Sequence, residues 1–136
     1  MNGSGWTSWP SPAPLWTGMA GLGVLYLFAL GLVCLLSPRH ARRFFGGFAT
    51  SPAHNLIEAL ARAGCGLALM GHAPLSKAPD LLYGLGAFLV LSAGALVLWY
   101  RTHRAYAARA VPFAQRHLFW MGCGALALGA GLLLLY

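Results

Sequence analysis

Four long apolar stretches alternate with short polar ones along this chain of 136 residues. They cover about residues 15–36, 52–71, 81–100 and 118–136. At about 1.5 Å of rise per residue, a helix over each stretch has roughly the length needed to cross the ~30 Å hydrocarbon core of a membrane. Short connections place consecutive helices side by side. The pattern therefore predicts an all-α fold, an integral membrane bundle of four transmembrane helices.

Prolines and capping residues mark the expected ends of these helices. Pro38 and Pro74 follow the first and second stretches, as is typical just after a helix end. Ser51 precedes Pro52, which is the combination favoured at a helix start, with Ser as N-cap and Pro in the first turn. Asp80 is expected to cap the third helix in the same way.

The connections and the N-terminal end are polar or interfacial in character. Residues 39–50 are basic and then aromatic, which predicts a linker at the membrane interface. Residues 101–117 are basic again, and their first half is expected to form a short surface helix that Pro112 breaks. Residues 1–14 are uncharged and rich in Gly, Ser, Pro and Trp, which predicts a flexible or interfacial tail before a single transmembrane domain over residues 15–136.

Composition points to lipid as the solvent for most of the surface. The chain is 59% hydrophobic and 8% charged, whereas a soluble domain is about 25% charged. The net charge of +7 raises the possibility of nucleic-acid binding. We exclude nucleic acid as a partner because the basic residues lie in short loops between apolar stretches, which is the pattern of membrane topology. The three cysteines lie inside apolar stretches and are expected to act as small hydrophobic residues.

Lysine and arginine are distributed unevenly between the two sides of the predicted bundle. The second connection contains only Lys77, and no basic residue precedes Arg39, so the first apolar stretch lacks the positive start of a secretory signal and is expected to remain in the protein. Basic loops stay in the cytoplasm. The chain is therefore expected to be a multi-pass inner-membrane protein with both termini outside the cytoplasm and anionic lipid headgroups near its basic loops. These loops contain Arg39, Arg42, Arg43, Arg101, Arg104, Arg109 and Arg116.

The second apolar stretch differs from the others because it contains charge. Glu58, one of only two acids in the chain, is followed four residues later by Arg62. On a helical projection the polar residues form one stripe, leucines lie opposite, and alanines and glycines lie between the two. This sorting predicts that the stripe faces the bundle interior while small residues allow close helix contacts. The stripe consists of His54, Glu58, Arg62, Cys65 and His72.

Two explanations for the Glu58–Arg62 pair remain open. A charge at the centre of a membrane helix costs roughly 2.5–3.5 kcal/mol, and burying a pair seldom recovers the full desolvation energy. The pair can act as a structural clamp that fixes helix register, or it can mark an ion, proton or substrate site. Because Arg62 lies one turn from Glu58 and would keep it ionised, a buried structural pair is the favoured interpretation.

Other kinds of site have little support in the sequence. His40, His103 and His117 lie in basic connections and are expected to be solvated. Haem is not expected, because His54 and His72 lie near opposite ends of one helix and the other apolar stretches contain no internal histidine. A metal site is not expected either, since Glu58 is the only acid within an apolar stretch. The sequence therefore predicts no cofactor, no metal and no catalytic residue.

The run from Ser37 to Pro74 resembles a group of small, uncharacterised bacterial inner-membrane proteins. The resemblance covers about a third of the chain and implies a four-helix integral membrane protein, with no reaction or ligand attached. The matching residues are Pro38, Ala41, Arg42, Phe44, the FATS of residues 48–51, His54, Glu58, Arg62, the GLAL of residues 66–69, Ala73 and Pro74.

Three classes of function are compatible with the sequence. The first is a structural or accessory membrane subunit that packs against itself or against a larger membrane partner. The second is a small transporter or channel whose path follows the polar stripe. The third is a membrane enzyme acting on a lipid or isoprenoid, with Arg62 and the basic loops holding an anionic group. The first is favoured because the charges are paired with each other and no second intramembrane acid is present.

Overall fold

The computed structural model describes residues 13–48 and 50–136, and this part of the chain is all-α, as the sequence predicts. Residues 1–12, most of the predicted tail, lie outside the described residues. The helices are α1 (Ala13–Leu36), α2 (Pro38–Gly46), α3 (Pro52–His72), the 3-10 turn η1 (Ala73–Leu75), α4 (Pro79–Leu98), α5 (Tyr100–Arg116) and α6 (Leu118–Leu134).

Within the described residues, two to three candidate membrane spans are present by length and composition, where the sequence predicts four. α1 and α4 are each long and apolar enough to cross a membrane. α5 and α6 meet at a break with a bend of 93° and qualify as a third candidate when taken together. α3 has 21 residues, which is long enough, but its polar side chains lower its apolar character.

The structure confirms one predicted helix start and corrects another. The Ser51 hydroxyl accepts a hydrogen bond from the backbone N–H of His54 at 3.2 Å, so Ser51 caps α3 as expected. α4 begins earlier than predicted, at Pro79, with Ala78 in the N-cap position and no capping side chain. Asp80 instead lies in the first turn of α4, where its negative charge interacts favourably with the helix dipole.

Both arginine-rich connections are more helical than the sequence predicts. Residues 38–46, expected to be a linker, form α2, because Ala41 and Phe45 lie on one face and are buried there while the arginines point outward. α5 continues through Pro112 to Arg116, so the predicted break at Pro112 is wrong. The chain turns instead at His117, which ends α5 and precedes α6.

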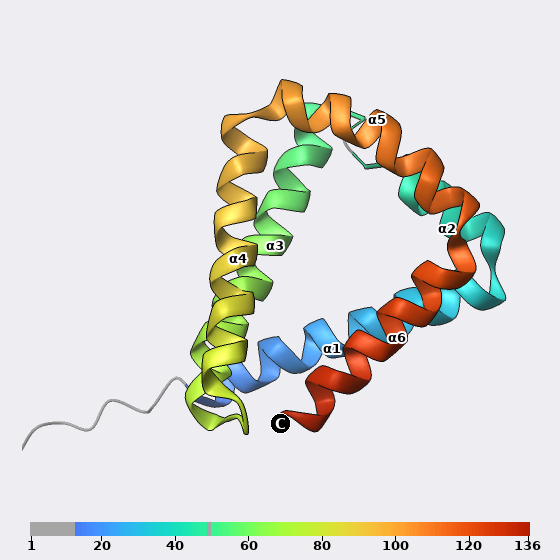
Figure 1. The fold of residues 1–136 in the computed structure, drawn as a ribbon. Coiled ribbons are helices and arrows are strands. Elements are labelled where there is room, and N and C mark those ends of the chain that lie inside the picture. The colour runs from blue at the N-terminus through green and yellow to red at the C-terminus, as the bar shows by residue number, and fades with distance from the viewer. Residues whose placement is uncertain (1–12, 49) are drawn as a thin grey trace, which may run out of the picture.

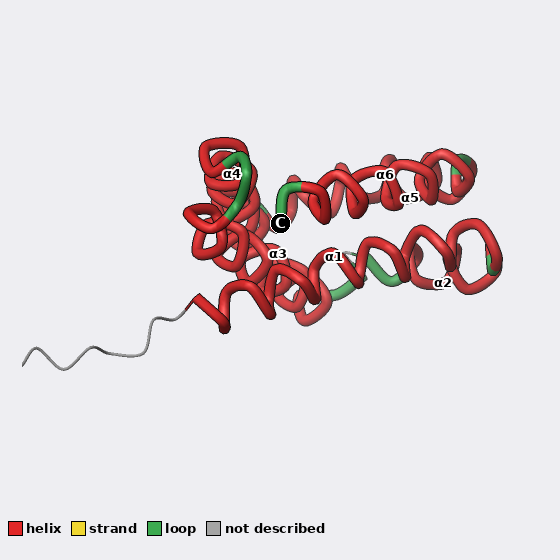
Figure 2. Tube along the Cα trace, turned by 90° about the horizontal axis from the view of Figure 1, so that it is seen from below, coloured by secondary structure: helices red, strands yellow, loops and turns green. Residues whose placement is uncertain are grey.

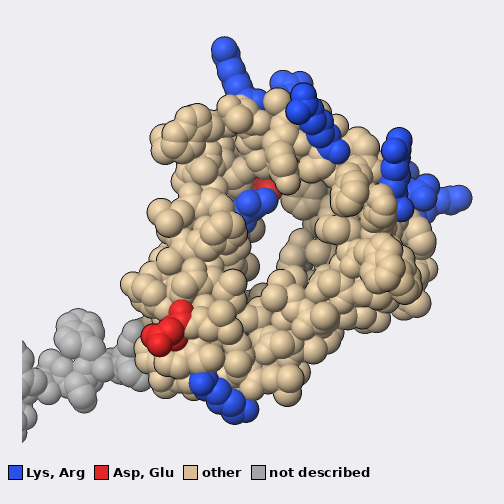
Figure 3. Space-filling view, viewed as in Figure 1, with Lys and Arg blue, Asp and Glu red and all other residues tan. Residues whose placement is uncertain are grey.

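The helices form two antiparallel pairs that diverge (Figures 1 and 2), and the space-filling view shows a frame with an opening at its centre (Figure 3). α3 packs along α4, and α1 packs along α6. The two pairs meet at the start of α1 and the end of α3, which we call the apex. α5 closes the opposite side of the frame and lies beside α2. This arrangement differs from a single four-helix bundle because only one end of the two pairs is in contact.

Glycines allow both helix pairs to pack closely. A Cβ on Gly66 of α3 would lie 2.6 Å from the Gly86 carbonyl oxygen of α4, so only glycine fits there. In the other pair, a Cβ on Gly31 of α1 would lie 2.6 Å from Cγ of Leu126 in α6. Close backbone approach through small residues is the usual way in which helices associate in lipid. The predicted role of the small residues of α3 is therefore confirmed at Gly66 and at the buried Ala59.

The largest buried cluster fills the apex. Ala20 and Val24 of α1 pack there against Ala68 and Leu69 of α3, with Leu82 of α4 fully buried beside them. A second cluster joins α1, α2 and the start of α6 around Ala41 and Phe45. Apolar packing thus fixes the two ends of the α1/α6 pair and leaves the middle of the frame open.

Candidate functional site

The predicted polar stripe of α3 is distributed over different surroundings. His54 and Cys65 are exposed, and His72 is buried at the apex. Glu58 and Arg62 lie between these extremes. The fully buried side of α3 is instead the adjacent one, where Asn55, Ala59 and Gly66 lie. The reason is that α4 packs on the small residues of α3, whose close contact gives the larger packing gain.

The Glu58–Arg62 pair forms, but it is not the buried pair that the sequence predicts. Arg62 Nη2 donates to Glu58 Oε1 at 2.6 Å. The Arg62 side chain is 39% exposed and the Glu58 side chain 10% exposed. Arginine can extend its long stem while keeping the guanidinium near solvent. The Glu58 carboxylate is therefore largely enclosed, whereas its cation lies at the surface of the frame.

His103 of α5 is the residue that sequence reasoning placed wrongly. It was expected to be solvated, but its side chain is 16% exposed and its Nε2 lies 3.6 Å from Glu58 Oε2. The carboxylate of α3 thus faces an imidazole on α5 as well as Arg62 on its own helix. Tyr100 lies three residues before His103, on the same face of α5. That spacing is the only signal in the sequence for this arrangement.

We group the ion-paired and buried polar side chains of the first half of α3 and of the first turn of α5 as the polar junction: Asn55, Glu58, Arg62, Tyr100 and His103. Asn55 Nδ2 donates to the Leu96 carbonyl oxygen of α4 at 2.9 Å, which ties α3 to α4. Within the described residues, four buried atoms of the junction have no hydrogen-bond partner. They are Asn55 Oδ1, Glu58 Oε2, Tyr100 Oη and His103 Nε2.

His72, at the opposite end of α3, serves the apex. Its Nδ1 lies 3.1 Å from the Thr17 hydroxyl of α1. Its ring stacks on Tyr136 with 4.3 Å between centroids, and the Tyr136 hydroxyl donates to the Thr17 carbonyl oxygen at 3.3 Å. His72 is 3% exposed. These contacts join α1, α3 and the segment after α6. His72 is therefore part of the apex and does not belong to the polar junction.

The arginine-rich helices lie together at the side of the frame opposite the apex. Gln115 Nε2 of α5 donates to the Arg42 carbonyl oxygen of α2 at 2.8 Å. A space-filling view shows basic side chains gathered over α5 and α2, whereas an acid and a base lie near the start of α4 (Figure 3). Lys77 belongs to the latter end, where its Nζ donates to the Leu134 carbonyl oxygen at 3.0 Å.

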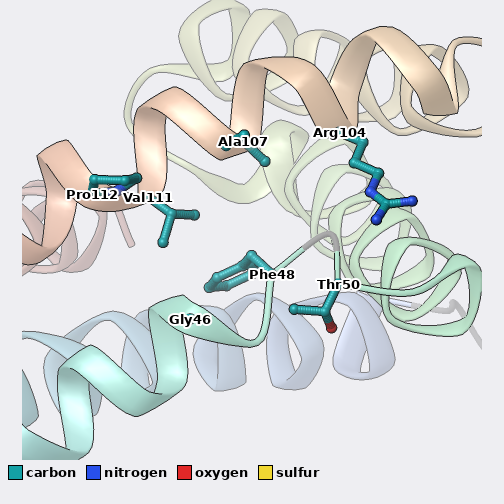
Figure 4. A pocket seen from close by; sticks show the side chains of 8 residues that line it. Gly46, Phe48, Thr50, Arg104, Ala107, Val111 and Pro112 are labelled. Atoms are coloured by element: carbon teal, nitrogen blue, oxygen red, sulfur yellow. The ribbon is translucent and has the colours of Figure 1, made fainter.

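A pocket of about 240 Å³ lies between the end of α2 and the face of α5. Figure 4 shows Arg104 at one end of it and Pro112 at the other, with Phe48 between them. Its remaining walls are small or apolar, so the pocket offers one guanidinium beside an apolar surface. Among the described residues, no group of three or more His, Cys, Asp or Glu side chains can hold a metal ion.

Comparison of the chain with protein-family models, with curated proteins and with solved structures finds no match. The resemblance of residues 37–74 to small inner-membrane proteins therefore stays a prediction.

Proposed function

We propose that this chain is an accessory or structural membrane protein that crosses the inner membrane four times and packs against a partner's transmembrane helix at the opening of its frame. The four spans are α1, α3, α4 and α6. In this arrangement α5 and α2 lie along the cytoplasmic surface, and the apex and both termini lie on the other side. The concentration of arginines on α2 and α5 supports this orientation.

The observation that carries the proposal is the exposure of Arg62. Figure 3 shows an acidic and a basic patch over α3 at the rim of the opening, and α3 contains one acid and one base of this kind, Glu58 and Arg62. A guanidinium 39% exposed between apolar helices is unfavourable in lipid. A partner helix that enters the opening and offers a hydrogen-bond acceptor would remove this exposure. Covering the Arg62 guanidinium would also lower the free-energy cost of placing α3 across the membrane as the fourth span.

Purification in mild detergent tests the proposal. We expect a complex of constant composition, either with a second membrane protein or with a second copy of this chain, measured by native mass spectrometry. Arg62→Gln should dissociate this complex. Arg101→Gln on the exposed surface of α5 removes the same charge and should leave it intact. A protein that remains a monomer under all conditions, or a complex that is indifferent to Arg62→Gln, would contradict the proposal.

A small transporter or channel is the second candidate, and the unpartnered buried atoms of the polar junction favour it. Glu58 Oε2 and His103 Nε2 lie 3.6 Å apart, and neither atom has a hydrogen-bond partner within the described part of the chain. Carboxylates and histidines inside membrane helices are the groups that form proton relays. Flux measurements in vesicles test this candidate. Proton or solute movement by the purified chain, abolished by His103→Gln, would favour transport over the accessory role.

A further inference from the structure

A second pocket lies where two span ends and both arginine-rich helices meet. It has a volume of about 230 Å³ and lies between the end of α1, the start of α2, the end of α5 and the start of α6. Cationic and amide donors form one part of its wall, and apolar side chains form another. We call it the arginine pocket, and its main lining residues are Leu35, Arg42, Gln115, Arg116, Leu118 and Phe119.

Among the described residues, neither arginine of this pocket forms an ion pair with a side-chain carboxylate. The chain contains two acids. Glu58 is bonded to Arg62, and Asp80 lies in the first turn of α4, away from α5. Two guanidinium groups lining one small pocket repel each other, and a bound anion relieves that repulsion. Charge complementarity therefore favours an anionic occupant.

The pocket is held in place by the surrounding structure. Gln115 of α5 is fixed by its hydrogen bond to the Arg42 carbonyl oxygen at 2.8 Å. Ala41 and Phe45 bury the inner face of α2 against Leu118. Arg42 and Arg116 are thus carried by two helices that are already joined. A preformed site loses less entropy when a ligand binds.

The position of the pocket relative to the membrane indicates which kind of anion is near it. α1 ends at Leu36 and α6 begins at Leu118, so the pocket lies at the level where the proposed spans leave the hydrocarbon. Phe119 and Trp120 at the start of α6 are exposed, as aromatic side chains are at the headgroup layer. Phosphate groups of lipids occupy that layer. Leu35 and Phe119 then lie on the hydrocarbon side of the two arginines.

We infer that the arginine pocket binds the phosphate diester of an anionic phospholipid. The guanidinium groups of Arg42 and Arg116 bind the phosphate oxygens, for which their planar donor geometry is well suited. The apolar wall formed by Leu35, Leu118 and Phe119 receives the first part of an acyl chain. The same phosphate chemistry is offered by free inorganic phosphate, but an apolar wall at the membrane surface favours the lipid. This inference rests on the proposed membrane insertion.

The test uses the full-length protein in neutral detergent and short-chain phosphatidylglycerol as the probe, with the shift of the thermal unfolding midpoint as the readout. The double variant Arg42→Gln/Arg116→Gln should raise the dissociation constant at least about tenfold, since it removes two charge-assisted contacts. The control Arg39→Gln/Arg109→Gln removes the same net charge outside the pocket and should change it less than about threefold. Arg42→Lys/Arg116→Lys keeps the charge and should lie between these two results.

Three results would overturn the inference. Equal weakening by the two glutamine double variants would mean diffuse attraction without a site. Equal binding of short-chain phosphatidylcholine would mean that the anionic headgroup is irrelevant. Equal protection by inorganic phosphate would mean a free-phosphate site. Flotation of the protein with phosphatidylcholine vesicles checks membrane insertion separately, so failure of insertion and failure of the lipid site are distinguished. The lysine double variant keeps both charges, so it shows whether loss of binding follows the lost guanidinium geometry.

Discussion

The α3/α4 pair and the α1/α6 pair both bring glycines into close contact, but they differ in the side-chain hydrogen bonds that accompany this packing. In α3/α4, Gly66 approaches a backbone carbonyl of α4, and Asn55 adds a hydrogen bond to the Leu96 carbonyl oxygen. In α1/α6, a Cβ on Gly31 would meet the side chain of Leu126 first and the Gly122 carbonyl oxygen next, at 3.0 Å. Among the described residues, the side-chain hydrogen bond that joins these segments lies at the apex, from Tyr136 to Thr17. One pair combines packing with polar contacts, and the other depends almost entirely on packing.

This difference explains where polar chemistry occurs in the molecule. Lipid is as apolar as leucine, so helices associate in it through close packing and hydrogen bonds. The α1/α6 pair obtains its stability mainly from shape, and neither of its helices contains a charged residue. α3 is held by α4 on its small-residue side, which leaves Glu58 and Arg62 free to face α5 and the opening.

The largest effect is expected at Gly66. Gly66→Ala places a Cβ 2.6 Å from the Gly86 carbonyl oxygen and 2.8 Å from Cγ2 of Val90. Backbone cannot rotate away, so α3 and α4 must separate, which we expect to lower the free energy of unfolding by up to about 3 kcal/mol. Chemical denaturation in detergent measures it. The control is Gly64→Ala, which meets no atom within 4 Å and should be neutral or slightly stabilising. Equal stability of the two variants would refute close packing of this pair.

The next effect is an asymmetry within the charge pair. Arg62→Gln leaves the enclosed Glu58 carboxylate without its cation and should destabilise by about 2 kcal/mol. Glu58→Gln leaves a neutral amide whose oxygen can still accept from Arg62, which is 39% exposed, and should cost less than about 1 kcal/mol. The double variant should recover part of the loss from Arg62→Gln. Thermal unfolding in detergent compares the three proteins. Two equally destabilised single variants would indicate a fully buried pair instead.

A smaller loss is expected in the apolar pair at Gly31. Gly31→Ala places a Cβ 2.6 Å from Cγ of Leu126. The Leu126 side chain can move to a less favourable rotamer, and the nearest backbone atom, the Gly122 carbonyl oxygen, lies 3.0 Å from the added Cβ, so the expected loss is smaller than at Gly66, about 1 kcal/mol. The matched control in α1 is Gly23→Ala, which meets nothing within 4 Å. If Gly31→Ala proves more harmful than Gly66→Ala under the same denaturant, the proposed difference between the pairs is wrong.

The smallest effect is expected at the apex. Tyr136→Phe removes the hydroxyl that donates to the Thr17 carbonyl oxygen at 3.3 Å but keeps the ring that stacks on His72. A long hydrogen bond at a partly exposed position contributes about 0.5 kcal/mol. The midpoint of thermal unfolding should therefore fall only slightly. Tyr136→Ala removes the stacked ring as well and serves as the positive control, with a clearly larger fall.

The prediction from sequence was most reliable where one local feature decides the structure. Long apolar runs and the Ser51-Pro52 pair were enough to predict an all-α chain and the start of α3. It was wrong at Pro112, where α5 continues to His117 because a proline costs one helical hydrogen bond but does not exclude a helix. It also missed α2, whose buried face of Ala41 and Phe45 is short and lies among arginines.

The sequence by itself determined which helices are apolar, which one is charged, and where the arginines lie, because hydrophobic length and charge are properties of short segments. Only the tertiary structure decided that His103 faces Glu58, that Arg42 and Arg116 line one pocket, and that Arg62 reaches an opening. These placements depend on how the two helix pairs diverge from the apex. This divergence depends on which helices contact each other at their glycines. The sequence around a glycine does not show which helix it will contact.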